Sequence, residues 1–202
     1  MDNIKELLLI FVKNPQKGNV KTRLAKTVGD NQALAVYQAL LEHTHRITAP
    51  MDRPRQVWYS NTIDTNDCWE QGGFGKRQQS GNNLGERMQH AFQQSFNHDF
   101  QKVVLIGSDC AQLTQAIIDQ TFTDLDDNDV VIGPSEDGGY YLLGMRRFFG
   151  DLFAGIEWST PTVFEETVGR VQSQGRSLEL LPTLNDIDTE EDLKNSASNL
   201  AY

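Results

Sequence analysis

Five cationic side chains gather in one short segment near the start of the chain. They are Lys13, Lys17, Lys21, Arg23 and Lys26, and no acidic residue lies among them. The whole chain carries a net charge of −10, so this local reversal of sign needs a cause. Salt screens exposed charges beyond roughly 8 Å, so the cations of this basic segment, residues 13–26, set the local field. The chemistry they suggest is the capture of an anion such as phosphate, and the alternative is a solvated basic loop.

The order of residues in the basic segment favours an anion site. Gly18 would let the backbone approach a bound anion closely. Lys21 and Arg23 fall where a helix is expected to start, and free backbone amides at a helix start also favour phosphate. The segment matches neither the P-loop nor the dinucleotide-binding G-x-G-x-x-G motif. We expect two lysines of the segment, Lys17 and Lys26, to be surface charge.

Asp109 is the first acidic residue with a suitable position for chemistry. It follows an apolar run, residues 102–106, after a single Gly-Ser pair. A carboxylate there suits a hard divalent cation, because Mg²⁺ usually takes one or two carboxylates together with substrate phosphate oxygens. The alternative is a local role, in which Asp109 closes an Asx turn or caps the helix expected near Thr114.

Asp186 and Asp188 form a second acidic position. In an extended segment, alternation would place both carboxylates on the same side. Adjacent carboxylates repel, and a bound cation would relieve the repulsion. The alternative is capping of a final helix, in which Asp188 or Thr189 is the N-cap and Asp192 completes a capping box.

Two glycine-containing segments complete the candidate residues. In the stretch 133–141, Gly138 and Gly139 would permit a tight turn and close approach to a ligand, beside Asp137 and Tyr140. The alternative is a simple hairpin, because Asp-Gly is a strong hairpin signal. In the stretch 78–85, three residues could contact a base or sugar, although turn chemistry explains most of this stretch. They are Gln79, Asn82 and Gly85.

Apolar runs alternate with amphipathic ones along the chain, which indicates α/β architecture in one domain over residues 1–202. The patterns predict strands over residues 4–12, 55–60, 102–106, 129–132, 140–145 and 177–182. They predict helices over residues 31–48, 84–96, 115–125 and 160–174, and a last helix opening at Thr189. The polar clusters follow strand ends, where open α/β sheets form their ligand sites.

Composition excludes several classes of protein. The chain is 38% hydrophobic and 23% charged, which is typical of a globular protein. No apolar run is long enough to span a bilayer, and the start of the chain does not read as a signal peptide, so we expect a cytoplasmic protein with no membrane partner. The acidic balance argues against nucleic acid as a partner. Cys68 and Cys110 form neither a disulfide framework nor a zinc site.

Five segments together resemble a known family. They are Phe11 to Leu24, Leu84-Gly85-Glu86-Arg87-Met88, Gly107-Ser108-Asp109-Cys110, Asp137-Gly138-Gly139-Tyr140-Tyr141 and Asp186-Ile187-Asp188-Thr189. Their order resembles that of the selenodomain-associated transferases, a glycosyltransferase-like family similar to 2-phospho-lactate guanylyltransferase. The resemblance runs from about Leu7 to Leu193. It implies the GT-A, or nucleotide-diphospho-sugar transferase, fold: a three-layer α/β/α arrangement around a mostly parallel mixed sheet.

The resemblance also implies roles for residues. Lys13, Gly18, Lys21 and Arg23 would hold nucleotide phosphates, while Asp109 and Asp188 would hold a divalent cation, Mg²⁺ or Mn²⁺. We assign catalysis to Lys21, Arg23 and Asp109. The predicted substrate-binding residues are Lys13, Gly18, Gln79, Asn82, Gly85, Asp137, Gly138, Gly139 and Tyr140.

The acidic motif departs from that of many sugar transferases of this fold. Asp109 is followed by Cys110 and Ala111, so there is no D-x-D motif. Nucleotidyltransferases often manage with one Asp, which favours attack of a small phosphate or hydroxyl acceptor on the α-phosphate of a nucleoside triphosphate. The alternatives are glycosyl transfer from a nucleotide sugar, and a catalytically silent nucleotide-binding module. The base, the acceptor and the oligomeric state are not indicated.

Overall fold

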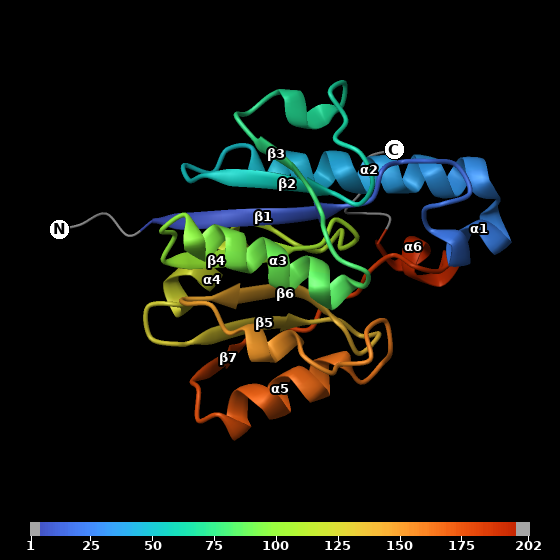
Figure 1. Cartoon of the computed structure of the whole chain (residues 1–202). Helices are drawn as coiled ribbons and strands as arrows, with labels where there is room; N and C mark the ends of the chain where they lie inside the picture. The colour runs from blue at the N-terminus through green and yellow to red at the C-terminus, as the bar shows by residue number, and fades with distance from the viewer. Residues whose placement is uncertain (1–4, 197–202) are drawn as a thin grey trace.

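The computed structural model describes residues 5–196, which form one seven-stranded sheet (Figure 1). The strands are β1 (Glu6–Val12), β2 (Arg55–Tyr59), β3 (Gly75–Gln78), β4 (Lys102–Ile106), β5 (Val130–Pro134), β6 (Tyr140–Met145) and β7 (Leu178–Leu180). Their order is β3-β2-β1-β4-β6-β5-β7. β6 runs antiparallel to β4 and β5, and the other neighbours are parallel. The predicted mostly parallel mixed sheet is confirmed.

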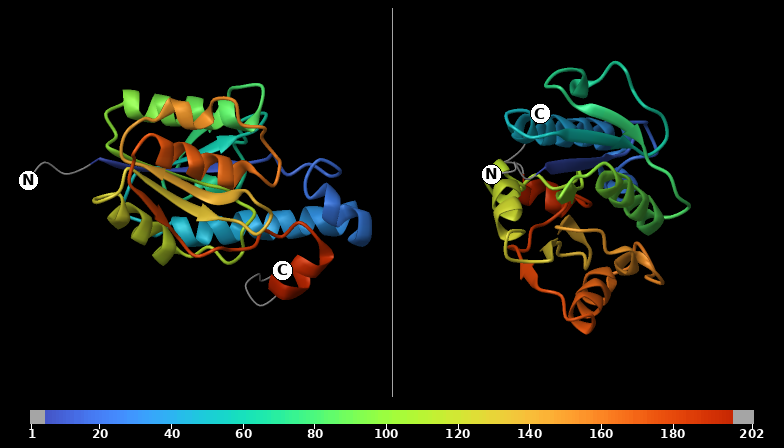
Figure 2. Two further views of the ribbon diagram at one scale, coloured as in Figure 1. Left: turned by 90° about the horizontal axis from the view of Figure 1, so that it is seen from below. Right: turned by 60° about the vertical axis from the view of Figure 1, so that its left-hand side comes forward.

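Helices cover both faces of the sheet. They are α1 (Thr22–Val28), α2 (Asp30–Thr48), α3 (Leu84–Asn97), α4 (Gln115–Asp124), α5 (Val163–Ser173) and α6 (Glu190–Ser196), with short 3-10 turns η1 (Cys68–Glu70) and η2 (Gly150–Phe153). α3 and α5 lie on one face, while α2 and α4 lie on the other (Figure 2). This is the three-layer α/β/α arrangement.

The core explains why β1 is apolar at successive positions. Leu7 and Leu9 pack into the cluster formed with α3 and α5, whereas Leu8 and Ile10 pack into the cluster under α2 and α4. All four side chains are fully buried. A parallel central strand with helices on both faces must be apolar on both sides.

Most predicted elements match the structure within two residues, and the differences at β3, α5 and β5 have physical reasons. β3 was not predicted, because its residues Gly75–Gln78 are polar and lie at the sheet edge. α5 begins at Val163, and the expected helix start at Thr160 and Pro161 is wrong, because these residues form the turn before it. β5 extends to Pro134, opposite Tyr140 in a hairpin. The predicted strand residue Ile4 lies outside the described residues.

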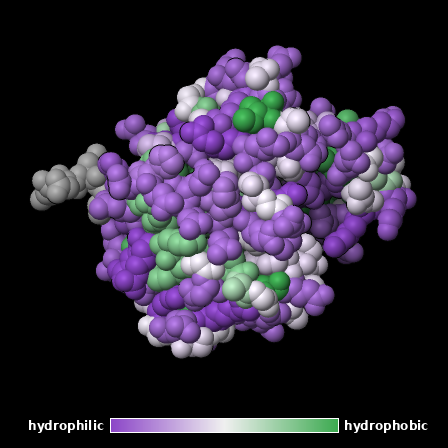
Figure 3. Space-filling view, viewed as in Figure 1, coloured by the Kyte–Doolittle hydropathy of each residue, from purple (hydrophilic) through white to green (hydrophobic). Residues whose placement is uncertain are grey.

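The topology brings the candidate residues to one edge. β1 and β4 are parallel neighbours, so the basic segment and Asp109 emerge side by side, and the hairpin between β5 and β6 turns at the same edge. The face in Figure 3 is largely hydrophilic, with small apolar areas. Within residues 5–196, no helix has the length and apolar character needed to cross a membrane.

Candidate functional site

Two adjoining cavities lie at the carboxyl ends of β1 and β4. The smaller, of about 210 Å³, is lined by the basic segment, Tyr37 of α2 and the two predicted metal ligands. The larger, of about 410 Å³, extends toward the β5–β6 hairpin and the segment before α5. The two cavities share Lys13, Arg23, Asp109 and Asp188, so they form one cleft with these charges at its centre.

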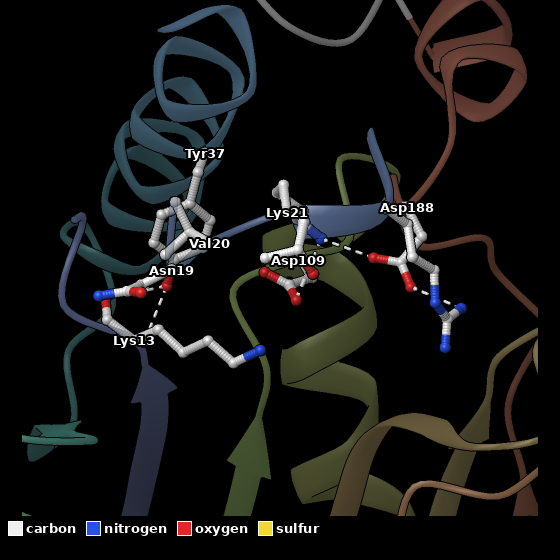
Figure 4. Close-up of a pocket in the computed structure, with 9 residues that line it drawn as sticks. Lys13, Asn19, Val20, Lys21, Tyr37, Asp109 and Asp188 are labelled. Atoms are coloured by element: carbon white, nitrogen blue, oxygen red, sulfur yellow. Dashed lines mark hydrogen bonds and ion pairs between the residues drawn. The ribbon is translucent and has the colours of Figure 1, made fainter. Parts of the chain in front are cut away.

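Lys21 lies between the two predicted metal ligands (Figure 4). Its Nζ is 3.1 Å from Oδ2 of Asp109 and 3.2 Å from Oδ1 of Asp188. Burial alone would lower the pKa of Lys21, but the charges of Asp109 and Asp188 outweigh it and hold this pKa above its ordinary value. The Lys21 side chain is 3% exposed, so the ammonium is a fixed part of the site.

Arg23 has a different environment from Lys21. Its Nη1 is 3.4 Å from Oδ2 of Asp188, and its side chain is 68% exposed. Lys13 is also exposed and lines both cavities. These two cations are therefore accessible to an anion that enters the cleft, whereas Lys17 and Lys26 are exposed and line neither cavity.

The local capping roles belong to other residues. Thr114 caps α4 by accepting a hydrogen bond from the backbone of Ile117, so the capping alternative for Asp109 is wrong. Thr189 and Asp192 form a reciprocal capping box, in which each side chain accepts a hydrogen bond from the other's backbone N–H. The side chain of Asp188 thus remains available for Lys21 and Arg23.

Asp186 adds a third carboxyl group to the cleft. It lines the larger cavity on the same side as Asp188, as alternation predicted. Burial raises the pKa of Asp186 to about 7, and the negative charge of Asp109 adds to the effect although Lys21 opposes it. This carboxyl can therefore hold a proton near neutral pH.

The carboxylates fit a hard divalent cation. Across residues 5–196, no group of three or more His, Cys, Asp or Glu side chains is arranged to hold a metal ion. However, Asp109 and Asp188 already converge on one positive charge, the Lys21 ammonium. Two carboxylates are sufficient for Mg²⁺ when phosphate oxygens and water complete its coordination.

Tyr37 is a site residue that the sequence did not reveal. Its hydroxyl oxygen accepts a hydrogen bond from the backbone N–H of Lys13 at 2.8 Å and lies 3.3 Å from Oγ of Ser108. Both Tyr37 and Ser108 are buried. This one hydroxyl therefore connects the end of β1 to the end of β4, and so fixes the basic segment relative to Asp109.

Two glycines that are predicted to bind substrate pack closely against another segment of the chain. A Cβ on Gly85 would lie 2.0 Å from Nε1 of Trp158, and one on Gly138 would lie 2.0 Å from the carbonyl oxygen of Pro161. Trp158 and Pro161 belong to the same segment before α5, and both line the larger cavity. The two glycines therefore allow close packing of the segment that forms one wall of the cleft.

The remaining predicted residues divide into two groups. Asp137, Gly139 and Tyr140 line the larger cavity within the β5–β6 hairpin, so the hairpin is confirmed and their substrate-binding role stays a prediction. Gln79 donates through Nε2 to the carbonyl oxygen of Trp58, and Asn82 donates to Glu86 at the start of α3. Within the described residues these two side chains line neither cavity.

Gly18 has the backbone conformation expected of the basic segment. Its φ is +79°, and no atom lies within 4 Å of the position that a Cβ would take. The turn therefore requires glycine for its conformation, and it is open on the side where a side chain would project.

The sheet order, the basic segment after β1 and the acidic residue after β4 define a protein of the nucleotide-diphospho-sugar transferase fold. The chain belongs to a family described as an uncharacterized protein conserved in bacteria (DUF2064), whose model matches residues 43–160. A similar solved structure is a Desulfovibrio desulfuricans G20 protein provisionally named a nucleotide-diphospho-sugar transferase. The two sequences are 34% identical over 93% of this chain and 84% of the other, with a TM-score of 0.86.

More distant structures share the fold. The inositol-1-phosphate CTP transferase of T. maritima is 12% identical, covering 98% of this chain and 96% of its own, with a TM-score of 0.62. The Mycobacterium tuberculosis H37Rv protein Rv0371c, in complex with manganese, is 13% identical over 96% of this chain and 98% of its own, with a TM-score of 0.54. Among proteins with curated functions, no significant match is found.

Proposed function

We propose that this protein is a transferase that moves a nucleotidyl group from a nucleoside triphosphate to a small phosphate or hydroxyl acceptor. The observation that carries the proposal is the charged centre shared by the two cavities, where Lys13 and Arg23 face Asp109 and Asp188. Phosphates would occupy the smaller cavity beside the basic segment. The larger cavity would hold the rest of the nucleotide and the acceptor.

The proposed reaction needs position and charge and no protein nucleophile. An acceptor oxygen forms a bond to the α-phosphorus, the bond from that phosphorus to its bridging oxygen breaks, and pyrophosphate leaves. A hydroxyl acceptor would release its proton to water. Lys21 and Arg23 would neutralise the charge that shifts onto the leaving group, and such fixed charges are worth most in a partly dry site.

Asp109 and Asp188 would hold the divalent cation, which polarises phosphate oxygens and orients them when it is bound. The manganese complex of Rv0371c, a protein with the same fold, supports the choice of a divalent ion. Lys13, which is exposed and lines both cavities, would bind the outer phosphates.

A second candidate function is glycosyl transfer from a nucleotide sugar. The name of the Desulfovibrio relative, at 34% identity, favours it. The same cleft would hold the donor, and the leaving group would then be a nucleoside diphosphate. The motif order resembles that of the selenodomain-associated transferases, a glycosyltransferase-like family similar to 2-phospho-lactate guanylyltransferase. The absence of a D-x-D motif after Asp109 favours nucleotidyl transfer.

The test is a screen of nucleoside triphosphates and nucleotide sugars with small phosphorylated and hydroxylated acceptors, read by product. Release of pyrophosphate supports nucleotidyl transfer, while release of a nucleoside diphosphate supports glycosyl transfer. Asp109→Asn and Arg23→Ala should each lower kcat by about 10²–10³-fold, the usual loss for one charge-stabilising group. Lys17→Ala removes an exposed lysine of the same segment and should leave turnover unchanged.

A catalytically silent protein would give a different pattern. It would bind a nucleotide without metal dependence and turn over no donor. Near-normal turnover by both Asp109→Asn and Arg23→Ala would place the reaction elsewhere.

A further inference from the structure

Three cations face the cleft, and only one of them is buried. Lys13 is exposed and Arg23 is 68% exposed, whereas the side chain of Lys21 is 3% exposed. Lys21 also adopts a left-handed backbone conformation, with φ 47° and ψ 44°, which a non-glycine residue rarely takes. The Lys21 side chain is directed inward, toward the acidic side of the cleft.

The Lys21 ammonium occupies the place where a metal ion would be expected. Its Nζ contacts Oδ2 of Asp109 and Oδ1 of Asp188 at almost equal distances, 3.1 and 3.2 Å. Figure 4 shows the ammonium directed at these two side chains. The charge of Asp109 and Asp188, here called the carboxylate pair, is therefore already partly neutralised from within the chain.

A free divalent cation would meet two obstacles at the carboxylate pair. It would have to displace Lys21 from both oxygens, and among the described residues Asp109 and Asp188 are the carboxylates that pair with this ammonium. A buried charge left without a partner is unfavourable. The positive charges of the metal and the ammonium would also repel each other at short range.

A polyphosphate changes this balance. Its oxygens can accept the Lys21 ammonium, and they can also complete the coordination of a cation held by Asp109 and Asp188. The basic segment and the carboxylate pair line the same cavity, so one side-chain movement can exchange the two sets of partners.

We propose that Lys21 is the resident cation of the carboxylate pair, that it excludes a free divalent ion, and that nucleoside triphosphate binding transfers its ammonium to the phosphates. This inference rests on the proposed function for the identity of the anion. It makes Lys21 a residue that couples metal binding to nucleotide binding. Metal and nucleotide should therefore each increase the affinity of the protein for the other.

The experiment is a titration of Mn²⁺ into the full chain, followed by electron paramagnetic resonance of the free ion. Wild type, Lys21→Met, Lys21→Arg and Lys17→Met are compared, each with and without an α,β-methylene nucleoside triphosphate. Lys17→Met is the matched control, because it removes one exposed positive charge from the same segment. Circular dichroism confirms that each variant is folded.

Without nucleotide, Lys21→Met should bind Mn²⁺ roughly tenfold or more tightly than wild type, a normal size for coupled sites. Lys17→Met and Lys21→Arg should behave like wild type. The nucleotide analogue should raise the Mn²⁺ affinity of wild type more than that of Lys21→Met, because only wild type has an ammonium to move.

Two results would overturn the proposal. One is equal Mn²⁺ affinity of folded Lys21→Met and Lys17→Met without nucleotide. The other concerns wild type only: an Mn²⁺ affinity that is the same without the nucleotide analogue as with it. If wild type does not bind the analogue at all, the proposed function fails, while the comparison of the two methionine variants still tests the role of Lys21.

Discussion

Replacing Tyr37 by phenylalanine should weaken the connection between the two halves of the cleft. The Tyr37 hydroxyl accepts the backbone N–H of Lys13 at 2.8 Å, lies 3.1 Å from the Lys13 carbonyl oxygen and lies 3.3 Å from Oγ of Ser108. Phenylalanine keeps the ring, and hence the packing of α2 against β1. The change therefore tests the hydroxyl alone.

The size of the effect follows from the partners left behind. The Lys13 amide and the Ser108 hydroxyl would lose a partner in a buried environment, which costs about 1–3 kcal/mol of folding free energy. For a chain of this length, each kcal/mol lowers Tm by about 2–4 °C. Because the Lys13 backbone would also be less fixed, the affinity of the basic segment for a polyphosphate should fall.

The assays are urea unfolding for stability and calorimetric titration with tripolyphosphate for affinity. Tyr59→Phe is the matched control: its hydroxyl donates to Asp67 at 2.6 Å, and Asp67 keeps its ion pair with Lys76. Tyr59→Phe should change stability without changing tripolyphosphate affinity. Unaltered stability of Tyr37→Phe would refute the hydrogen-bond reasoning, and unaltered affinity would refute the positioning role.

Two further predictions concern the framework of the site. Gly138→Ala should lower the free energy of unfolding in urea by about 1–3 kcal/mol more than Gly18→Ala does. Both glycines have positive φ, but only Gly138 has a carbonyl oxygen 2.0 Å from an added Cβ. Equal losses of stability would refute the close approach. At Asp129, burial would raise the pKa, but hydrogen bonds from Ser177 and Arg146 outweigh it and lower this pKa. A carboxyl whose pKa is lowered in the folded state stabilises the fold at pH values above its ordinary pKa. This stabilisation is lost as the pH falls through the lowered pKa. Asp129→Asn should therefore destabilise at pH 5 and lose less stability than wild type below pH 3.8, measured by urea unfolding at several pH values; parallel pH profiles would contradict this.

The sequence was sufficient where structure depends on local pattern. The apolar runs that became β1 and β4 are buried on both faces, so their composition alone identified them. Thr189 and Asp192 of the capping box lie only three positions apart, so the sequence alone predicts this motif. Because parallel strands end at one edge, the same pattern also placed the basic segment near Asp109.

The sequence was insufficient where a role depends on a distant partner. Gly85 and Gly138 were interpreted as ligand contacts, but each fits closely against the segment before α5, which no local pattern connects to them. Tyr37 contacts a residue 71 positions away, and Lys21 contacts one 167 positions away. These side chains had several possible partners in the sequence, and only the fold selects among them.

The most direct test is a crystal structure of the protein with Mn²⁺ and an α,β-methylene nucleoside triphosphate. We predict anomalous scattering from manganese between Asp109 and Asp188, phosphates beside Lys13 and Arg23, and the Lys21 ammonium on a phosphate oxygen. A nucleotide bound away from the basic segment would contradict the proposed function. A bound nucleotide with Lys21 still on both carboxylates, and no manganese between them, would contradict the exchange of partners at the centre of the cleft.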